Sequence, residues 1–427
     1  MKFMNNRVVI TGIGVVCPIG INLAQFESSI KQGNSGIVII NELEELGLSC
    51  NIGGLVEISD KSEHLQNLKI FNASRSLRLC FDATLEAIGI ASLQKIYNNE
   101  KKTDYDTGII LGSLGGQTDI LETIFNKVNN GSFKKTRESI AEQGMFSGVS
   151  SVIAGLFGLG NCAITSSTAC ASSTDAIVSG YHKIKSGRAK RIISGGYDIY
   201  NKYTWAIFDI LKIITPNFNN NPQKGSCPMS DCASGFVPGE GAGILILEDL
   251  DTAINRGAKI LGEIVGVHSN SGGQRNGGTM SAPNPEGIIK CIQDCIAMSN
   301  VNYNDIELIS GHLTSTMADV IEIQSWSKAL NRTGKDFPYI NALKSMTGHT
   351  IGAAGAIETI AGLLQMNGSF VHPTINCDEI HPKISDIIDE SRIPRKTIKD
   401  ININCFAKAS FGFGDVNSCL IIKKFNL

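Results

Sequence analysis

The stretch Ala163-Ile164-Thr165-Ser166-Ser167-Thr168-Ala169-Cys170-Ala171-Ser172-Ser173 predicts a short buried strand that turns through small residues into a helix, with Cys170 at the corner. The helix is expected to run to about Lys185, and Arg191–Gly196 predicts the next strand. The free N–H groups and positive dipole of a helix N-terminus favour a thiolate over a thiol. Cys170 is therefore a candidate nucleophile, although most intracellular cysteines are simply small buried apolar residues.

Composition and charge limit the class of protein. The chain has 427 residues, 42% hydrophobic and 18% charged, so it can bury a large core as two domains or one large duplicated fold. A formal net charge of -2 gives no general attraction to nucleic acid or to an anionic membrane. An acidic partner would therefore need a local basic patch.

The cysteines indicate the cellular compartment in which the protein is expected. Twelve of them are spread from Cys17 to Cys419 among apolar neighbours, and the N-terminal sequence lacks the apolar core of a signal peptide. We expect reduced thiols and a cytoplasmic protein. No stretch approaches the ~20 continuous apolar residues of a membrane span.

Periodicity and glycine positions predict the other elements and a boundary near residue 255, between an N-terminal half (1–255) and a C-terminal half (256–427). Gly12–Cys17 comes close to a dinucleotide fingerprint but has Cys17 where the third glycine should stand, so it predicts a tight turn. The predicted helices are Leu23–Gln32, Arg75–Ala91, Gly287–Met298 and Ala353–Met366. The predicted strands are Arg7–Thr11, Thr107–Gly112, Ile244–Glu248, Lys259–Gly266, Asp305–Ser310, Tyr339–Leu343, Asn402–Phe406 and Ser418–Lys423.

Three strand ends of the second half are expected to meet at one rim. They carry His312, then Lys344 with His349, and then the loop Ser410–Gly414. Strand ends are where α/β folds place their chemistry. Either histidine alone is more simply explained as a core residue, but two histidines with a thiol at a helix start fit thioester chemistry.

Five motifs in this order resemble the β-ketoacyl-[acyl-carrier-protein] synthases of the elongating class, which have the thiolase fold. The resemblance covers nearly the whole chain, and the lysine-to-histidine motif is its most specific part. The motifs are Thr168–Cys170, Gly235–Val237 with Gly239–Gly243, His312–Thr316, Lys344–Gly355 and Ser410–Gly414.

The resemblance implies a duplicated five-layer α-β-α-β-α architecture and a Cys170–His312–His349 triad. Its reaction is a decarboxylative Claisen condensation: the cysteine takes an acyl chain from a thioester, and malonyl-acyl carrier protein then supplies the attacking carbanion. It implies no metal and no cofactor, since the substrates travel on the phosphopantetheine of an acyl carrier protein. It also implies a homodimer, with a heterodimer containing a ketosynthase-like subunit as an alternative.

The resemblance assigns further roles. The backbone N–H groups of Cys170 and Phe411 would form an oxyanion hole, with Phe411 also acting as a gate. Lys344 and Glu358 would form a buried ion pair that orients the histidines. Residues assigned to substrate binding are Leu114, Ser281, Thr316 and Phe413.

Basic residues in two segments resemble the carrier-docking regions of the family: Arg75 and Arg78 on a helix, and Lys134, Lys135 and Arg137 in a loop. The alternative is an ordinary solvated face.

The chain departs from the family pattern at several positions. Leu313 stands where glycine or alanine is usual, and Asp319 comes one residue early. Ala233 replaces an arginine, Ser230 an aspartate, and Asp415-Val416 a Gly-Thr pair. These departures leave open the substrate range, which includes saturated fatty, polyene and polyketide chains.

Other classes fit less well. A thiolase would carry a cysteine where this chain has Phe411, a related decarboxylase would lack Cys170, and a cysteine protease would need only one histidine. A chain-length partner subunit with little or no activity typically loses the nucleophile. The intact Cys170, His312 and His349 thus favour an active synthase.

Overall fold

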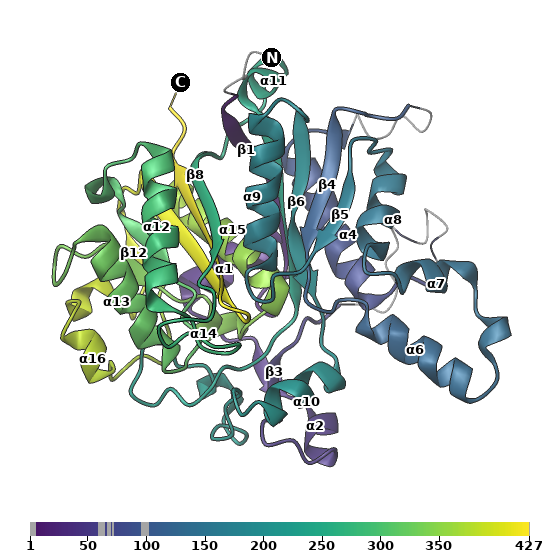
Figure 1. Ribbon diagram of the computed structural model, residues 1–427, viewed down its shortest axis with the longest axis horizontal. Coiled ribbons are helices and arrows are strands. Elements are labelled where there is room, and N and C mark those ends of the chain that lie inside the picture. Colours follow the sequence, from purple (N-terminus) through teal and green to yellow (C-terminus); the bar gives the residue numbers. More distant parts are fainter. Residues whose placement is uncertain (1–5, 59–64, 66–69, 71, 95–101, 427) are drawn as a thin grey trace.

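The computed structural model describes residues 6–58, 65, 70, 72–94 and 102–426. Its centre is a ten-stranded mixed sheet with the order β10-β9-β13-β14-β8-β1-β7-β6-β4-β5 (Figure 1). The strands of the first half are β1 (Val8–Val16), β4 (Thr107–Gly112), β5 (Ala163–Ser166), β6 (Arg191–Asp198) and β7 (Gly241–Asp249). Those of the second half are β8 (Gly262–Ser271), β9 (Leu308–Ser310), β10 (Tyr339–Asn341), β13 (Cys405–Gly412) and β14 (Val416–Lys423).

The two halves repeat one topology. In the first, β4 is parallel to β5 and β6, and β7 is antiparallel to β6 and β1. In the second, β9 is parallel to β10 and β13, and β14 is antiparallel to β13 and β8. The sets join where Val8–Ile10 of β1 pairs with Gly262–Ile264 of β8. The predicted boundary at residue 255 coincides with the end of α11 (Leu250–Asn255).

Helices form three layers around these strands. The central pair, α9 (Ser172–Lys185) and α15 (Ala354–Gly368), packs against strands of both halves. The outer helix α4 (Arg75–Ile90) packs on β1 and β7, and α12 (Pro285–Ser299) packs on β8 and β14 beside α13 (Ala318–Leu330). With the strands between them, these layers make the duplicated five-layer fold that the sequence predicts (Figure 1).

The two central helices touch at their N-terminal ends. The N–H of Ala356 on α15 donates to Oγ of Ser173 on α9, at 3.0 Å. A side chain at Gly355 would collide with Thr174, so glycine permits the approach. The beginnings of α9 and α15 are therefore held together.

Shorter elements surround the core. The helices are α1 (Leu23–Gln32), α2 (Asn41–Glu45), α6 (Thr118–Asn129), α7 (Glu138–Gln143), α8 (Gly148–Phe157), α10 (Lys202–Ile210), α14 (Lys344–Thr347) and α16 (Pro382–Ser385). The short strands are β2 (Ile37–Ile39), β3 (Ile52–Gly54), β11 (Phe370–Val371) and β12 (Ile398–Lys399). Single 3₁₀ turns are η1 (Phe133–Lys135), η2 (Pro222–Lys224), η3 (Tyr303–Asp305), η4 (Ile351–Ala353) and η5 (Glu390–Arg392). No helix among the described residues is long and apolar enough to cross a bilayer.

The four predicted helices correspond to α1, α4, α12 and α15, with ends shifted by at most two residues. Local signals set these limits. Asn22 accepts the N–H of Gln25 at the start of α1, and Gly33 ends the helix in the left-handed region at φ 73.

Two strand predictions and one turn prediction are wrong in part. β5 is not buried, because it is the last strand of the sheet and pairs only with β4; Ile164 is 42% exposed. The strand predicted at Asn402–Phe406 is β13, which extends to Gly412, so Ser410–Gly412 are strand residues rather than a loop. The turn predicted at Gly12–Cys17 is absent, since β1 continues to Val16.

Close packing explains the glycines of β1. A Cβ at Gly14 would overlap the carbonyl oxygen of Ala83 on α4, and one at Gly12 would overlap that of Ala87. These glycines let helix and strand backbones meet, and are not a cofactor loop.

We predict that Gly14→Ala lowers the free energy of unfolding by about 3 kcal/mol, because the new methyl group meets backbone that cannot move cheaply. Urea unfolding followed by circular dichroism measures this. The control is Gly89→Ala on α4, where the methyl group would lie 3.2 Å from the mobile Nε2 of Gln94. The control should change stability by less than about 1 kcal/mol. Equal effects of the two substitutions would contradict the packing argument.

Candidate active site

Cys170 lies in a tight elbow between β5 and α9. The residue before it, Ala169, has φ 50, which is unusual for a residue with a side chain. Ser172 stabilises the elbow: its Oγ accepts the Thr168 N–H at 2.9 Å and donates to the Ala169 carbonyl at 2.6 Å. Such local strain persists where the surroundings enforce it, often at functional sites.

The structure brings Cys170, His312 and His349 together, as the sequence predicts. His312 follows β9, and His349 follows α14. Sγ of Cys170 and a ring nitrogen of each histidine lie within 4.8 Å of one another, and all three residues are buried. The imidazole rings meet edge to face, with centroids 5.3 Å apart. These atoms could in principle hold a soft metal ion; the absence of a metal stays a prediction.

Hydrogen bonds define the tautomers of the histidines. Nδ1 of His349 accepts the N–H of Ile351 at 3.1 Å, and Nδ1 of His312 lies 3.3 Å from the Lys344 ammonium, which can only donate. Burial and the positive charge of Lys344 hold the pKa of both imidazoles well below 6.5. Each ring is thus neutral at pH 7 and carries its proton on Nε2. Nε2 of His349 has no partner among the described residues, so its N–H is available to a ligand.

The protonation state of Cys170 differs from the expectation that the helix N-terminus favours a thiolate. Burial raises the pKa of Cys170 to about 11, and the charge of Lys344 and the N–H of Phe413 offset this only in part. Desolvation outweighs the helix N-terminus, so the resting group is a thiol rather than a thiolate.

The end of β13 supplies a backbone N–H beside this thiol. The N–H of Phe413 faces Sγ of Cys170. The resemblance to the family had assigned the second oxyanion-hole N–H to Phe411 instead. Gly412 lets the strand approach, since a Cβ there would lie 2.6 Å from the Thr168 carbonyl oxygen and 3.2 Å from the Cys170 nitrogen. The Phe411 ring instead packs edge to face against His312, with centroids 6.0 Å apart. Phe413 follows the last residue of β13, and both phenylalanines line the cavity over the triad.

A buried charge cluster lies beneath the histidines. Lys344 and Glu358 form the predicted ion pair, and the Lys344 ammonium also donates to the His312 carbonyl oxygen at 2.5 Å. Lys408 on β13 binds the other oxygen of Glu358 at 2.8 Å. Sequence reasoning missed Lys408; the signal was a lysine inside the apolar run Phe406-Ala407-Lys408-Ala409.

Glu322 on α13 was also missed. Its two carboxylate oxygens accept the N–H groups of His312 and Leu313, both at 2.7 Å. Burial raises the pKa of this carboxyl to about 7. Glu322 therefore orients the backbone of the histidine motif.

A cavity of about 440 Å³ opens over the triad. Of the predicted substrate-binding residues, Ser281, Thr316 and Phe413 line it, and so does Phe411. Oγ1 of Thr316 lies 3.0 Å from Oγ1 of Thr314, a second hydroxyl in the lining. Leu114 is not in the lining; it packs with the apolar cluster of Phe236 and Ile351. Phe236 in turn meets the His349 ring, with centroids 5.3 Å apart.

Comparisons with known proteins agree with this geometry. Residues 5–253 match the family model "Beta-ketoacyl synthase, N-terminal domain", and residues 261–378 match "Beta-ketoacyl synthase, C-terminal domain". The chain belongs to the β-ketoacyl synthase family. The "3-oxoacyl-[acyl-carrier-protein] synthase 1" of Buchnera aphidicola subsp. Acyrthosiphon pisum is 33% identical over 98% of this chain and 100% of its own.

Two solved structures are similar along almost the whole chain. One is described as a type II PKS acyl-carrier protein in complex with its ketosynthase bound to the hexaketide; its TM-score is 0.86 at 27% identity, over 99% of this chain and 100% of that one. The other, "The ishigamide ketosynthase/chain length factor", has a TM-score of 0.85 at 26% identity with the same coverage. The thiolase-like fold of the chain is thus established.

Two departures of this β-ketoacyl synthase have local explanations. Asp319, although one residue early, accepts the N–H groups of Thr314 at 2.7 Å and Ser315 at 3.1 Å, so it holds the loop after His312. Leu313 is fully buried in the second-half core. Ala233, where an arginine is usual, lines the cavity.

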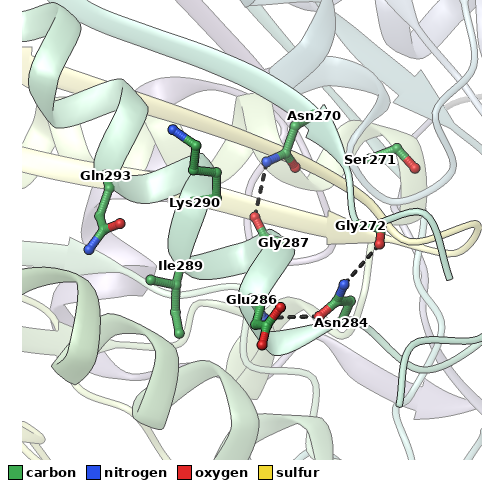
Figure 2. A pocket seen from close by; sticks show the side chains of 9 residues that line it. All are labelled: Asn270, Ser271, Gly272, Asn284, Glu286, Gly287, Ile289, Lys290 and Gln293. Atoms are coloured by element: carbon green, nitrogen blue, oxygen red, sulfur yellow. Dashed lines mark hydrogen bonds between the residues drawn. The ribbon is translucent and has the colours of Figure 1, made fainter. Parts of the chain in front are cut away.

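Asp415 organises a loop at the cavity mouth. It is buried with φ 62, and its carboxylate accepts the N–H groups of Gln274 at 2.8 Å and Asn284 at 2.9 Å. The ends of this loop are also joined directly, because Asn284 Nδ2 donates to the Gly272 carbonyl at 2.8 Å (Figure 2). Ser281 belongs to the segment between them, so Asp415 indirectly positions a cavity-lining hydroxyl.

The predicted docking residues divide into two groups. Arg75 binds Glu240 at 2.8 Å and the Val56 carbonyl at 2.6 Å, and Arg78 is half-buried, so both are less accessible to a carrier than the loop residues. Lys134, Lys135 and Arg137 are exposed between α6 and α7, which project to the right in Figure 1.

We predict that Asp415→Ala loosens the loop 272–284, because it removes both carboxylate acceptors and places alanine at a strained φ. The free energy of unfolding should fall by about 2 kcal/mol, and hydrogen exchange at the amides of Gln274 and Asn284 should accelerate. Asp415→Asn keeps one acceptor and tolerates the left-handed region, so it should lose less. Unchanged exchange in the alanine variant would contradict this role.

Proposed function

We propose that the chain is an active β-ketoacyl-[acyl-carrier-protein] synthase that condenses an acyl chain, carried on Cys170, with malonyl-acyl carrier protein. The supporting observation is a thiol within 4.8 Å of two neutral imidazoles in one cavity. The proposed substrate class follows the name of the curated relative, a 3-oxoacyl-[acyl-carrier-protein] synthase. The acyl chain is drawn from fatty, polyene or polyketide intermediates.

In the loading step, Sγ of Cys170 attacks the acyl thioester carbonyl. The bond from carbonyl carbon to phosphopantetheine sulfur breaks, a new thioester forms on Cys170, and the thiol proton ends on the departing sulfur. Because the resting thiol is protonated, its proton must leave during this step. The N–H groups of Cys170 and Phe413 are the proposed oxyanion hole, in place of the earlier assignment to Phe411. Phe411 remains the proposed gate, because its ring borders His312.

In the condensation step, the Nε2–H groups of His312 and His349 donate to the malonyl thioester oxygen. Carbon dioxide leaves, and the bonding electrons form an enolate whose charge these donors stabilise. The enolate carbon attacks the acyl-cysteine, a carbon–carbon bond forms, and Cys170 departs as a thiolate that takes up one proton. Neutral imidazoles suit this task, since they donate hydrogen bonds without protonating the carbanion readily.

A second chain is proposed at the exposed edge of β5. An unpaired edge strand with an exposed Ile164 offers backbone groups to another strand. A homodimer is the simplest occupant. The similar structure described as a ketosynthase/chain length factor supports a heterodimer as the second possibility, in which this chain is the catalytic member or a chain-length partner.

The other proposed partner is an acyl carrier protein, as in the similar complex. A cytoplasmic location fits the twelve free cysteines. We propose no nucleic-acid or membrane partner, no metal and no bound cofactor, since the phosphopantetheine arm arrives with the carrier.

Substitutions at the triad should separate the two half-reactions. Cys170→Ala should abolish acyl loading, whereas His312→Ala and His349→Ala should lose malonyl decarboxylation far more than loading. Loss of one donor to a developing enolate costs on the order of 3 kcal/mol, roughly a hundredfold in rate. Intact-protein mass spectrometry follows loading, and release of labelled carbon dioxide follows decarboxylation. Acylation of the Cys170→Ala protein would disprove the nucleophile.

Reversing Lys134, Lys135 and Arg137 to glutamate should raise KM for the acyl carrier protein several-fold, while KM for a small pantetheine thioester stays nearly constant. The wild-type KM for carrier should also rise as salt shortens the Debye length from ~10 Å at ~0.1 M to ~3 Å at ~1 M. The matched control reverses Lys328, Lys335 and Lys383, exposed lysines on or next to α13 and α16 at the opposite side of Figure 1. A similar rise of KM in the control would contradict the assignment of Lys134, Lys135 and Arg137 to a carrier-docking patch.

A further inference from the structure

Lys408 is a buried charge that the proposed mechanism does not yet use. Its side chain is completely inaccessible to solvent, in the middle of the apolar strand β13. Burying an ammonium is costly unless it is paired and hydrogen-bonded. Its partners are Oε2 of Glu358, at 2.8 Å, and the carbonyl oxygen of Ala409.

Glu358 consequently joins two cations. Lys344 binds Oε1, and Lys408 binds Oε2. The Lys344 ammonium then reaches the carbonyl oxygen and Nδ1 of His312. A continuous chain of contacts thus runs from Lys408 through Glu358 and Lys344 to a histidine of the triad.

The charges around this chain leave positive potential below the imidazoles. Glu322, from α13, faces Lys408, but burial raises the pKa of its carboxyl to about 7, so it is only partly ionised near neutral pH. Asp319, from the same helix, influences Glu322, and burial raises its pKa to about 6. His372 near Glu358 is neutral, since burial lowers its pKa to about 4. The ammonium groups of Lys344 and Lys408 therefore share the single carboxylate of Glu358, and both His312 and His349 sense the charge of Lys408. Burial lowers the pKa of Lys408, and the contact with Glu358 opposes this shift.

We propose that Lys408 is a positioning residue for decarboxylation: a built-in second cation that holds Glu358, and through it Lys344 and His312, and keeps positive charge beneath the oxygen where the enolate forms. This inference rests on the proposed condensation. A cation bound to the far oxygen of Glu358 stops that carboxylate from neutralising Lys344 alone. Loading on Cys170 depends less on Lys408, because its proposed oxyanion faces backbone N–H groups and the ammonium group that lowers the pKa of its thiol is that of Lys344.

The chain provides a matched control. In the first half, Glu248 is also completely buried between two cations, with Arg191 at 2.6 Å and Arg256 at 2.7 Å. Arg191 lies on β6 and Glu248 on β7, at the ends of these strands away from the triad. Removing Arg191 repeats the loss of one of two cations from a buried carboxylate without touching the proposed chemistry.

The experiment compares Lys408→Met, Lys408→Gln and Arg191→Met with the wild type. The readouts are Tm, acyl loading of Cys170, and malonyl-thioester decarboxylation without acyl donor from about pH 5.5 to about pH 8.5. Both methionine variants should lower Tm. Only Lys408→Met should lower the decarboxylation rate, by roughly tenfold or more relative to loading.

The pH profile has a defined direction. Removing a positive charge near the imidazoles raises their pKa, so they become protonated at higher pH. The acid-side decline of decarboxylation in Lys408→Met should therefore move to higher pH. Lys408→Gln keeps a donor for Glu358 without the charge, so it should recover Tm in part and retain the pH shift. If Lys408→Met does not fold, the pH profile of Lys408→Gln tests the proposal.

Three results would overturn the inference: an unshifted profile in both Lys408 variants, equal losses in loading and decarboxylation, or the same decarboxylation loss in Arg191→Met. Failure of the wild type to decarboxylate malonyl thioesters would instead disprove the proposed function. The two failures are thus distinguishable.

Discussion

The close contact between the beginnings of α9 and α15 is the constraint on which the site depends. Cys170 belongs to the first half of the chain and the histidines to the second, so the distance between the halves decides whether they can act together. Ser173 binds the backbone of α15, and Thr174 binds Ser410 on β13 with 2.8 Å between their hydroxyl oxygens. Larger residues here, above all at Gly355, would separate thiol and imidazoles. Small side chains along one helix seam therefore have a catalytic consequence although none of them touches substrate.

Electrostatics complements this packing. The imidazoles are buried over lysines, which keeps them neutral and makes them donors rather than acids. The same burial keeps the Cys170 thiol protonated at rest. The cavity therefore holds a thiol at rest, and the positive potential beneath the imidazoles is available to the negative charge that forms during the proposed condensation.

The sequence was informative where the signals were local. Helix periodicity and the order of the motifs located the predicted helices, the triad and the Lys344–Glu358 pair. Predictions from the sequence failed where contacts between elements that are distant in the sequence determine the structure. Ser410–Gly412 form a strand because they pair with β14. The glycines of β1 are required because α4 packs closely against that strand. β5 is exposed because it is the last strand of the sheet. Glu322 and Lys408 were overlooked because an isolated charged residue shows its burial only when its neighbours from other elements are known.

The sandwiching of α9 between both halves has a consequence for synthesis on the ribosome. The part of α9 that packs on β14 stays uncovered until the chain has been extended to Lys423, although β8 is complete at Ser271. At translation speeds of about 5–20 residues per second, the first half waits on the order of ten to thirty seconds before β14 covers this part of the helix. A nascent chain in that state is a natural client for holding chaperones, and slow codons between α11 and β14 would prolong its vulnerability to aggregation.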